Sequence, residues 1–122
     1  MIPEDIRQFV RSAIKSVWAL ELLLFLRRHA GAAWTVERLT IELRSSQPLV
    51  ADILASFKKS RLVEEKPDNL FEYRAASPEL DALVARLERA YAETPIALIK
   101  EIVSAPNEKI QSFADAFKFK QN

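Results

Sequence analysis

An apolar run at residues 17–26, which holds a single charged side chain, constrains the fold more than any other part of the sequence. Upstream of it, Ile6, Val10 and Ala13 are spaced by four and three residues, as on one packed face of a helix. Neither glycine nor proline interrupts this region, so one long N-terminal helix is predicted to continue to Gly31. Its second half is apolar on nearly all sides, which predicts a central core helix. Because the run is about half the length of a membrane span, no membrane-crossing segment is expected.

Residues 35–60 carry the pattern of two short helices joined by a tight turn. Thr35 is suited to cap the first helix, and residues 44–48 suit the turn and the start of the second. Four apolar residues of the second helix are predicted to face the core: Val50, Ile53, Leu54 and Phe57. The outward set is then Gln47, Pro48, Ala51, Asp52, Ala55, Lys58 and Lys59. This arrangement is a helix-turn-helix.

Two β-strands are predicted after this motif, at residues 62–66 and 70–74, and the residues between them favour a turn. The chain then returns to helix at Ser77, in three segments separated by prolines. The predicted fold is therefore mainly α with a small β-hairpin: a winged helix-turn-helix with a long N-terminal helix and a C-terminal helical extension. Residues 1–76 are predicted to form the winged-helix domain, and residues 77–122 the extension.

Over about residues 34–75 the sequence resembles the multiple-antibiotic-resistance regulator (MarR) family and related winged-helix regulators. The resembling residues are Thr35, Val36, Glu37, Arg38 and Leu39, then Val50, Ile53 and Leu54, and finally Phe57, Lys58, Lys59, Ser60, Arg61, Leu62, Val63 and Glu64. In such regulators the flanking helices commonly form a homodimer, and the third helix enters the major groove of double-stranded DNA. The resemblance implies a small homodimeric DNA-binding transcriptional regulator. Arg61 stands where the family usually has glycine.

The residues expected to contact DNA lie at the ends of the second helix of the motif and on the hairpin: Arg44, Ser46, Gln47, Lys58, Lys59 and Lys66. Residues 35–75 contain seven basic and seven acidic side chains, so their net charge is zero. Phosphate neutralisation supplies most non-specific DNA affinity, and Asp52 on the outward face repels a polyanion. The alternative function is a winged-helix protein–protein interaction module with little or no DNA binding.

Self-association is expected through the two ends of the chain. The residues predicted to form a dimer or partner interface are Ile6, Val10, Ile14, Ile110, Phe113 and Phe117. The last three belong to an amphipathic stripe in the C-terminal tail. Such a stripe can dock in a groove of a protein partner, or fold back over the chain's own core or a dimer mate.

The residue inventory predicts no enzyme activity, no cofactor and no metal site. The chain has no cysteine, which excludes a thiolate metal site and a cysteine nucleophile. Its one histidine, His29, cannot form a two-histidine relay, and its one glycine cannot build a phosphate-binding loop. The acidic N-terminus is unlike a signal peptide, which predicts a cytoplasmic protein. Glu21 is expected either to face water or to be buried beside a basic partner.

Overall fold

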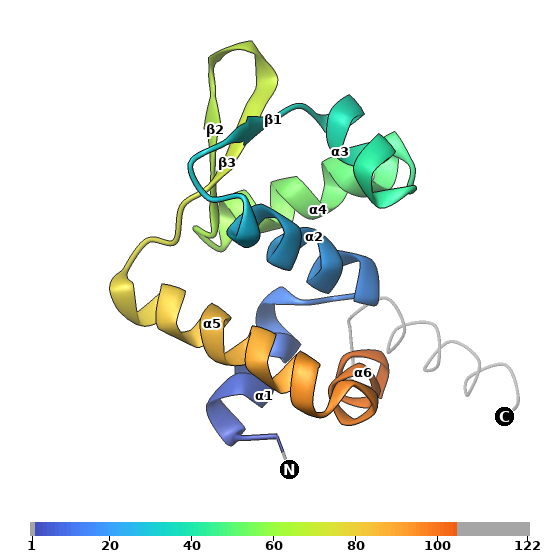
Figure 1. Cartoon of the computed structure of the whole chain (residues 1–122), viewed down its shortest axis with the longest axis vertical. Helices are drawn as coiled ribbons and strands as arrows, with labels where there is room; N and C mark the ends of the chain where they lie inside the picture. Colours follow the sequence, from blue (N-terminus) through green and yellow to red (C-terminus); the bar gives the residue numbers. More distant parts are fainter. Residues whose placement is uncertain (1, 105–122) are drawn as a thin grey trace, which may run out of the picture.

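The computed structural model describes residues 2–104, which form six α-helices and a small three-stranded antiparallel sheet (Figure 1). In chain order the elements are α1 (Glu4–Ala13), α2 (Val17–Arg28), β1 (Ala33–Trp34), α3 (Val36–Leu43), α4 (Gln47–Lys59), β2 (Val63–Lys66), β3 (Leu70–Tyr73), α5 (Pro78–Glu93) and α6 (Pro95–Ser104). A 3-10 turn, Pro67–Asn69, joins β2 to β3. The fold is mainly helical with a β-hairpin, as predicted.

The N-terminal segment is two helices, so the prediction of one long helix is wrong. α1 ends at Ala13, and both Ile14 and Ser16 have extended backbone. The Ser16 hydroxyl accepts a hydrogen bond from the Ala19 amide at 3.1 Å, which satisfies one of the free amides at the start of α2. A capping serine therefore begins a new helix where neither glycine nor proline signals a break.

Serine and threonine caps also begin the next three helices. The hydroxyls of Thr35, Ser46 and Ser77 accept hydrogen bonds from the amides of Arg38, Leu49 and Leu80, at 3.1, 3.4 and 3.1 Å. The predicted starts of α3, α4 and α5 are confirmed. The helix predicted after Pro106 lies outside the described residues. Within residues 2–104, no helix has the length and apolar character needed to cross a membrane.

β3 is the central strand of the sheet, with β1 on one side and β2 on the other. The predicted hairpin is confirmed, and its turn holds Asp68 and Asn69 at φ values of 68° and 59°. Asp and Asn tolerate this left-handed conformation, which fits them to the turn. β1 was not predicted because its two residues are too few to show an alternating pattern. Trp34 of β1 pairs with Phe71 of β3, which ties the start of α3 to the hairpin.

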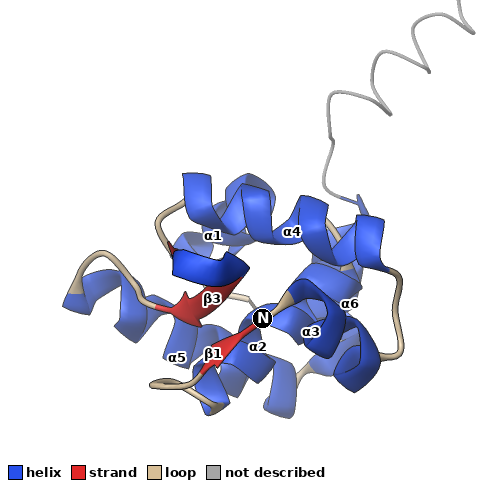
Figure 2. Cartoon of the chain, turned by 90° about the horizontal axis from the view of Figure 1, so that it is seen from above, coloured by secondary structure: helices blue, strands red, loops and turns tan. Residues whose placement is uncertain are grey.

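α2 is the central helix of the core, as its sequence predicts. Its fully buried residues are Leu20, Leu22, Leu23, Leu24 and Leu26. In Figure 1, α3, α4 and the sheet lie on one side of α2, and α1, α5 and α6 lie on the other. Figure 2 shows how small the strands are beside the helices. The chain thus surrounds one apolar helix with two groups of elements.

Three residues predicted to form a dimer interface lie in the chain's own core, which corrects that prediction. Ile6 is 2% exposed, and Val10 and Ile14 have no exposed surface. They are buried because α1 packs on α5 and α6 of the same chain. A second copy could reach them only if α1 left this packing. The other three residues of the predicted interface, Ile110, Phe113 and Phe117, lie outside the described residues.

Candidate interaction surface of α4 and the hairpin

α4 buries one face and exposes the other, as its sequence predicts. Its inner residues, Val50, Ile53, Leu54 and Phe57, are all buried. The Ser46 cap and Pro48 in its first turn fix where the helix begins, and the chain turns into β2 after Ser60. The inner face therefore anchors α4 rigidly, and the outer face is presented to solvent.

The outer face of α4 is small and nearly neutral. All seven residues predicted to face outward are exposed: Gln47, Pro48, Ala51, Asp52, Ala55, Lys58 and Lys59. Three of them are alanine or proline, which offer no side-chain hydrogen bond. At the centre of the face, the one polar group is the Asp52 carboxylate, an acceptor only. Basic side chains occur only at its C-terminal end.

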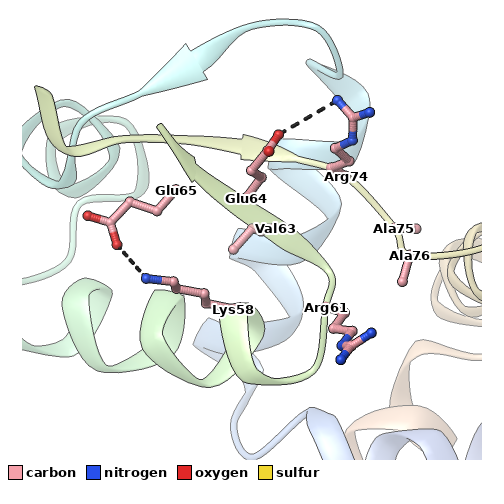
Figure 3. A pocket seen from close by; sticks show the side chains of 8 residues that line it. All are labelled: Lys58, Arg61, Val63, Glu64, Glu65, Arg74, Ala75 and Ala76. Carbon is pink, nitrogen blue, oxygen red and sulfur yellow. Dashed lines mark hydrogen bonds and ion pairs between the residues drawn. The ribbon is translucent and has the colours of Figure 1, made fainter. Parts of the chain in front are cut away.

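Acidic residues of the hairpin pair with three basic side chains on and near α4. Lys58 Nζ lies 2.9 Å from Glu65 Oε1, and Arg74 NH1 lies 3.6 Å from Glu64 Oε2 (Figure 3). On the sheet, Lys66 Nζ lies 2.6 Å from Glu72 Oε2. Two of the three lysines predicted to contact phosphate are thus engaged with carboxylates of the same chain.

The strand register explains why these ion pairs form. Glu64 and Glu72 are paired directly across β2 and β3, and like charges in that position repel. Lys66, two residues from Glu64, reaches Glu72 along the diagonal, and Arg74 reaches Glu64. The sequence shows these residue types, but only the register shows which of them meet. The two cations of the hairpin are therefore paired with two of its own carboxylates, those of Glu72 and Glu64.

The remaining predicted DNA contacts do not form one cluster. Arg44, Ser46 and Gln47 lie at the N-terminal end of α4, and Lys59 lies at its other end, about 20 Å away at 1.5 Å per residue. The Ser46 hydroxyl is already used as the helix cap. Among residues 2–104, neither Arg44 nor Lys59 has an ion-pair partner within 4.0 Å. The structure thus places the predicted contacts in two separate groups.

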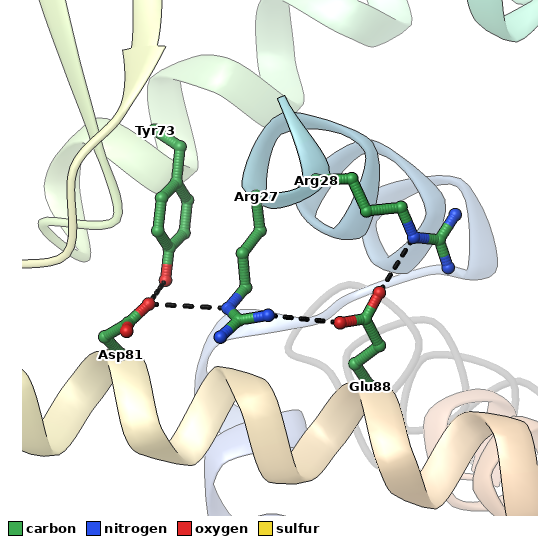
Figure 4. Close-up of polar contacts among 5 residues, drawn as sticks. All are labelled: Arg27, Arg28, Tyr73, Asp81 and Glu88. Carbon is green, nitrogen blue, oxygen red and sulfur yellow. Dashed lines mark hydrogen bonds and ion pairs between the residues drawn. The ribbon is translucent and has the colours of Figure 1, made fainter. Parts of the chain in front are cut away.

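A polar network that the sequence analysis missed fixes the end of the hairpin to α5 (Figure 4). Arg27 Nε lies 3.4 Å from Asp81 and its NH1 lies 3.1 Å from Glu88, while the Tyr73 hydroxyl donates to Asp81 at 2.6 Å. Arg28 also pairs with Glu88, at 2.8 Å. Burial, with the hydrogen bond to Asp81, raises the pKa of Tyr73 above its ordinary value of 10.0. Asp81 and Glu88 are seven residues apart, which puts them on one face of α5. This spacing is the sequence signal that could have predicted the network.

Among residues 2–104, Glu21 is neither free in water nor paired with a basic residue. The Tyr91 hydroxyl donates to Glu21 Oε1 at 2.7 Å, and this hydrogen bond, more than burial, raises the pKa of Tyr91. The carboxylate in the apolar run is therefore satisfied by a phenol of α5. Both expectations for Glu21, exposure to water and burial beside a basic residue, were therefore wrong.

His29 is exposed and lies in an aromatic cluster beyond the end of α2. Its ring centroid is 4.4 Å from that of Phe25 and 5.5 Å from that of Trp34. Its Nδ1 is 2.9 Å from the Phe25 carbonyl oxygen, so it caps the helix end. No group of three or more His, Asp or Glu side chains in residues 2–104 is arranged to hold a metal ion.

No protein-family model matches the sequence, and no curated protein is significantly similar to it. The features that bear on function are therefore the exposed face of α4, the charges of the hairpin and the surfaces beside them.

Proposed function

We propose that the chain is a winged helix, with α2, α3 and α4 as its three helices and β2–β3 as its wing. The order of the elements and the pairing of β1 with β3 support this assignment. Arg61 supports it further, because its φ of 60° is the left-handed conformation that glycine adopts freely. The MarR family usually has glycine at this position. For an arginine, this left-handed backbone conformation is less stable than the right-handed one by about 1 kcal/mol.

The function that the geometry supports best is a protein–protein interaction module that binds its partner through the outer face of α4. The observation that carries this proposal is the pairing of cations with hairpin acids, in which Lys58, Lys66 and Arg74 pair with Glu65, Glu72 and Glu64. Proteins that bind DNA strongly make about 6–10 phosphate contacts. Here each paired cation would have to leave its carboxylate and expose that carboxylate to the phosphates.

The chemistry of the outer face fits a protein partner. The centres of protein interfaces carry few charged residues, and the outer face of α4 has only Asp52 beside its stripe of small side chains, Pro48, Ala51 and Ala55. The neighbouring helix α3 exposes Ile41, which is 71% accessible. Small side chains let a partner helix approach α4 closely, since interaxial distance depends on the side chains at the contact.

A DNA-binding regulator is the second candidate, because three basic residues near the motif are exposed. Arg44, Lys59 and Arg61 have no ion-pair partner within 4.0 Å among residues 2–104. Three contacts would give weak, salt-sensitive binding, with a slope of log K against log salt of about −3. The two candidates therefore differ in a measurable quantity.

The test is a salt titration of the full chain on random duplex DNA, followed by fluorescence anisotropy. The interaction module predicts no binding at 50 mM salt, a concentration low enough for exposed charges to act strongly. A triple variant, Glu64→Gln, Glu65→Gln and Glu72→Gln, is the matched control. It removes three negative charges, frees Lys58, Lys66 and Arg74, and is expected to gain binding.

Circular dichroism of the parent and the triple variant checks that both are folded. Binding by the parent, with a slope of about −3 or steeper, would overturn the interaction module in favour of the regulator. Failure of the triple variant to gain affinity would contradict the argument that the hairpin acids suppress DNA binding.

A further inference from the structure

An apolar groove of about 310 Å³ lies between α4 and the turn that joins α1 to α2. Its apolar walls include Ala13, Ala19, Leu49, Ile53 and Phe57, and Lys15 and Asp52 are its charged residues. The junction between α1 and α2 forms one wall of the groove, and one side of α4 forms the opposite wall. Its volume is at the lower end of the range for pockets that bind ligands.

We propose that the chain's own C-terminal segment, residues 105–122, occupies this groove through the stripe Ile110, Phe113 and Phe117. This inference concerns an intramolecular contact and does not depend on what α4 binds. The stripe has spacings of three and four residues, which is the pattern by which an amphipathic helix fills an apolar groove.

The position of the end of α6 brings the segment to the groove. Glu101 Oε1 lies 3.4 Å from Arg7 Nε and 3.3 Å from Arg11 NH2, so the last turn of α6 is held against α1. Ile102 is buried in the core beside it. Arg11 is only two residues before Ala13, which lines the groove. The last turn of α6 therefore lies against the helix whose last residue, Ala13, lines the groove.

The linker is long enough for the stripe to enter the groove. Five residues, 105–109, separate Ser104 from Ile110. Fully extended, they span about 17 Å at 3.3–3.6 Å per residue. From Arg11 to Ala13 the helix rises about 3 Å and turns by about 200°, so the path also crosses α1, whose diameter with side chains is about 10–12 Å. The sum of the two is still shorter than the extended linker.

The charges of the groove and the segment are compatible. Lys15 and Asp52 have no ion-pair partner within 4.0 Å among residues 2–104. The segment carries both signs, as Glu108, Lys109, Asp115, Lys118 and Lys120. An acidic and a basic partner are therefore available for the two charged residues of the groove.

The chain's own segment is favoured over the same segment from a second copy. A short covalent linker gives an effective concentration in the millimolar range. A stable dimer interface buries about 800 Å² on each partner, far more than a groove of this size offers. Intramolecular docking needs no such area, since the linker has already brought the two surfaces together.

Docking would place the segment beside the outer face of α4, because Asp52 belongs both to that face and to the groove. A partner that uses the N-terminal half of α4 would then compete with the segment.

Because the chain has no cysteine, the contact can be tested with two introduced cysteines in the full chain. The pair is Ser56→Cys and Ala114→Cys. Ser56 lines the groove, and Ala114 is on the same side of the segment as the stripe. A disulfide requires Cα atoms within about 7 Å. Mild oxidation is expected to give an intramolecular link, seen as a faster monomer band on a non-reducing gel. The control pair, Asp68→Cys and Ala114→Cys, places one cysteine at the hairpin tip and is expected to stay reduced.

A nitroxide at Ser112→Cys, opposite the stripe on a helical wheel, gives a second measurement that does not depend on disulfide geometry. In NMR spectra, the nitroxide is expected to broaden the amide signals of Ala13, Ala19 and Ile53. Adding Phe113→Ser, which disrupts the stripe, is expected to restore these signals. A disulfide between two chains, or broadening only in mixtures of labelled and isotope-enriched chains, would replace the proposal with docking by a second copy. Absence of both the disulfide and the broadening would overturn it.

Discussion

Replacing Phe57 by alanine tests the orientation of α4, on which the surface argument depends. Phe57 is among the largest side chains without exposed surface, and it lies on the inner face of α4. A buried phenylalanine removes about 150–250 Å² from water. At about 25 cal/mol per Å², loss of most of this area costs roughly 3–4 kcal/mol, and the cavity left behind adds to it. We expect the free energy of unfolding to fall by about 3–5 kcal/mol.

The loss is large beside the total stability of a domain of this size, which is about 5–15 kcal/mol. Urea unfolding followed by tryptophan fluorescence measures it through Trp18 and Trp34. With a slope of about 2 kcal/mol per molar urea, the midpoint is expected to fall by roughly 2 M. Ala55→Ser, on the exposed side of the same helix, is the matched control and is expected to change stability by less than about 0.5 kcal/mol.

An unchanged midpoint for Phe57→Ala would refute the reasoning. It would mean that α4 is rotated about its axis and that Phe57 belongs to the outer face. The alanine and proline stripe would then point inward, and the proposed interaction surface would fail with it.

Two further perturbations test the junction of α1 and α2 and the network of Figure 4. Ser16→Ala removes the acceptor for the Ala19 amide and is expected to lower stability by about 1 kcal/mol in thermal or urea unfolding; no loss would contradict the capping role. The pKa of Tyr73 is raised on folding, so its contribution is complete below pH 10 and is lost as the pH rises towards its folded value. Tyr73→Phe removes this ionisation, and unfolding midpoints of the variant are expected to fall less steeply than those of the parent above pH 10; equal slopes would contradict this.

Much of the fold could be predicted because its signals are local. The caps at Thr35 and Ser77, the buried side of α4 and the hairpin turn each depend on residues within a few positions of one another. The central position of α2 followed from its composition alone. The break at Ser16 was missed because a serine inside an apolar pattern is common and does not by itself signal a helix end. Ile14, just before the cap, is buried by tertiary packing, which the sequence does not show.

The candidate surface was harder to predict because it depends on contacts distant in sequence. Arg27 and Asp81 are 54 positions apart, and no motif links them. The placement of Ile6 and Val10 in a dimer interface was wrong for a related reason: their stripe shows that one side of the helix is buried, and it does not show which elements cover it. Here the chain's own α5 and α6 provide the cover.

The cross-strand pair of Glu64 and Glu72 connects the stability of the hairpin to the choice of partner. Two carboxylates directly opposite each other destabilise a strand pair unless cations lie nearby. Arg74 and Lys66 supply those cations from within the hairpin. DNA phosphates that attracted the same two side chains would leave the carboxylates unscreened beside another polyanion, so binding would weaken the hairpin that makes the contact. A protein that approaches α4 through its alanine and proline stripe leaves these pairs intact, which is why the arrangement of charges favours a protein partner.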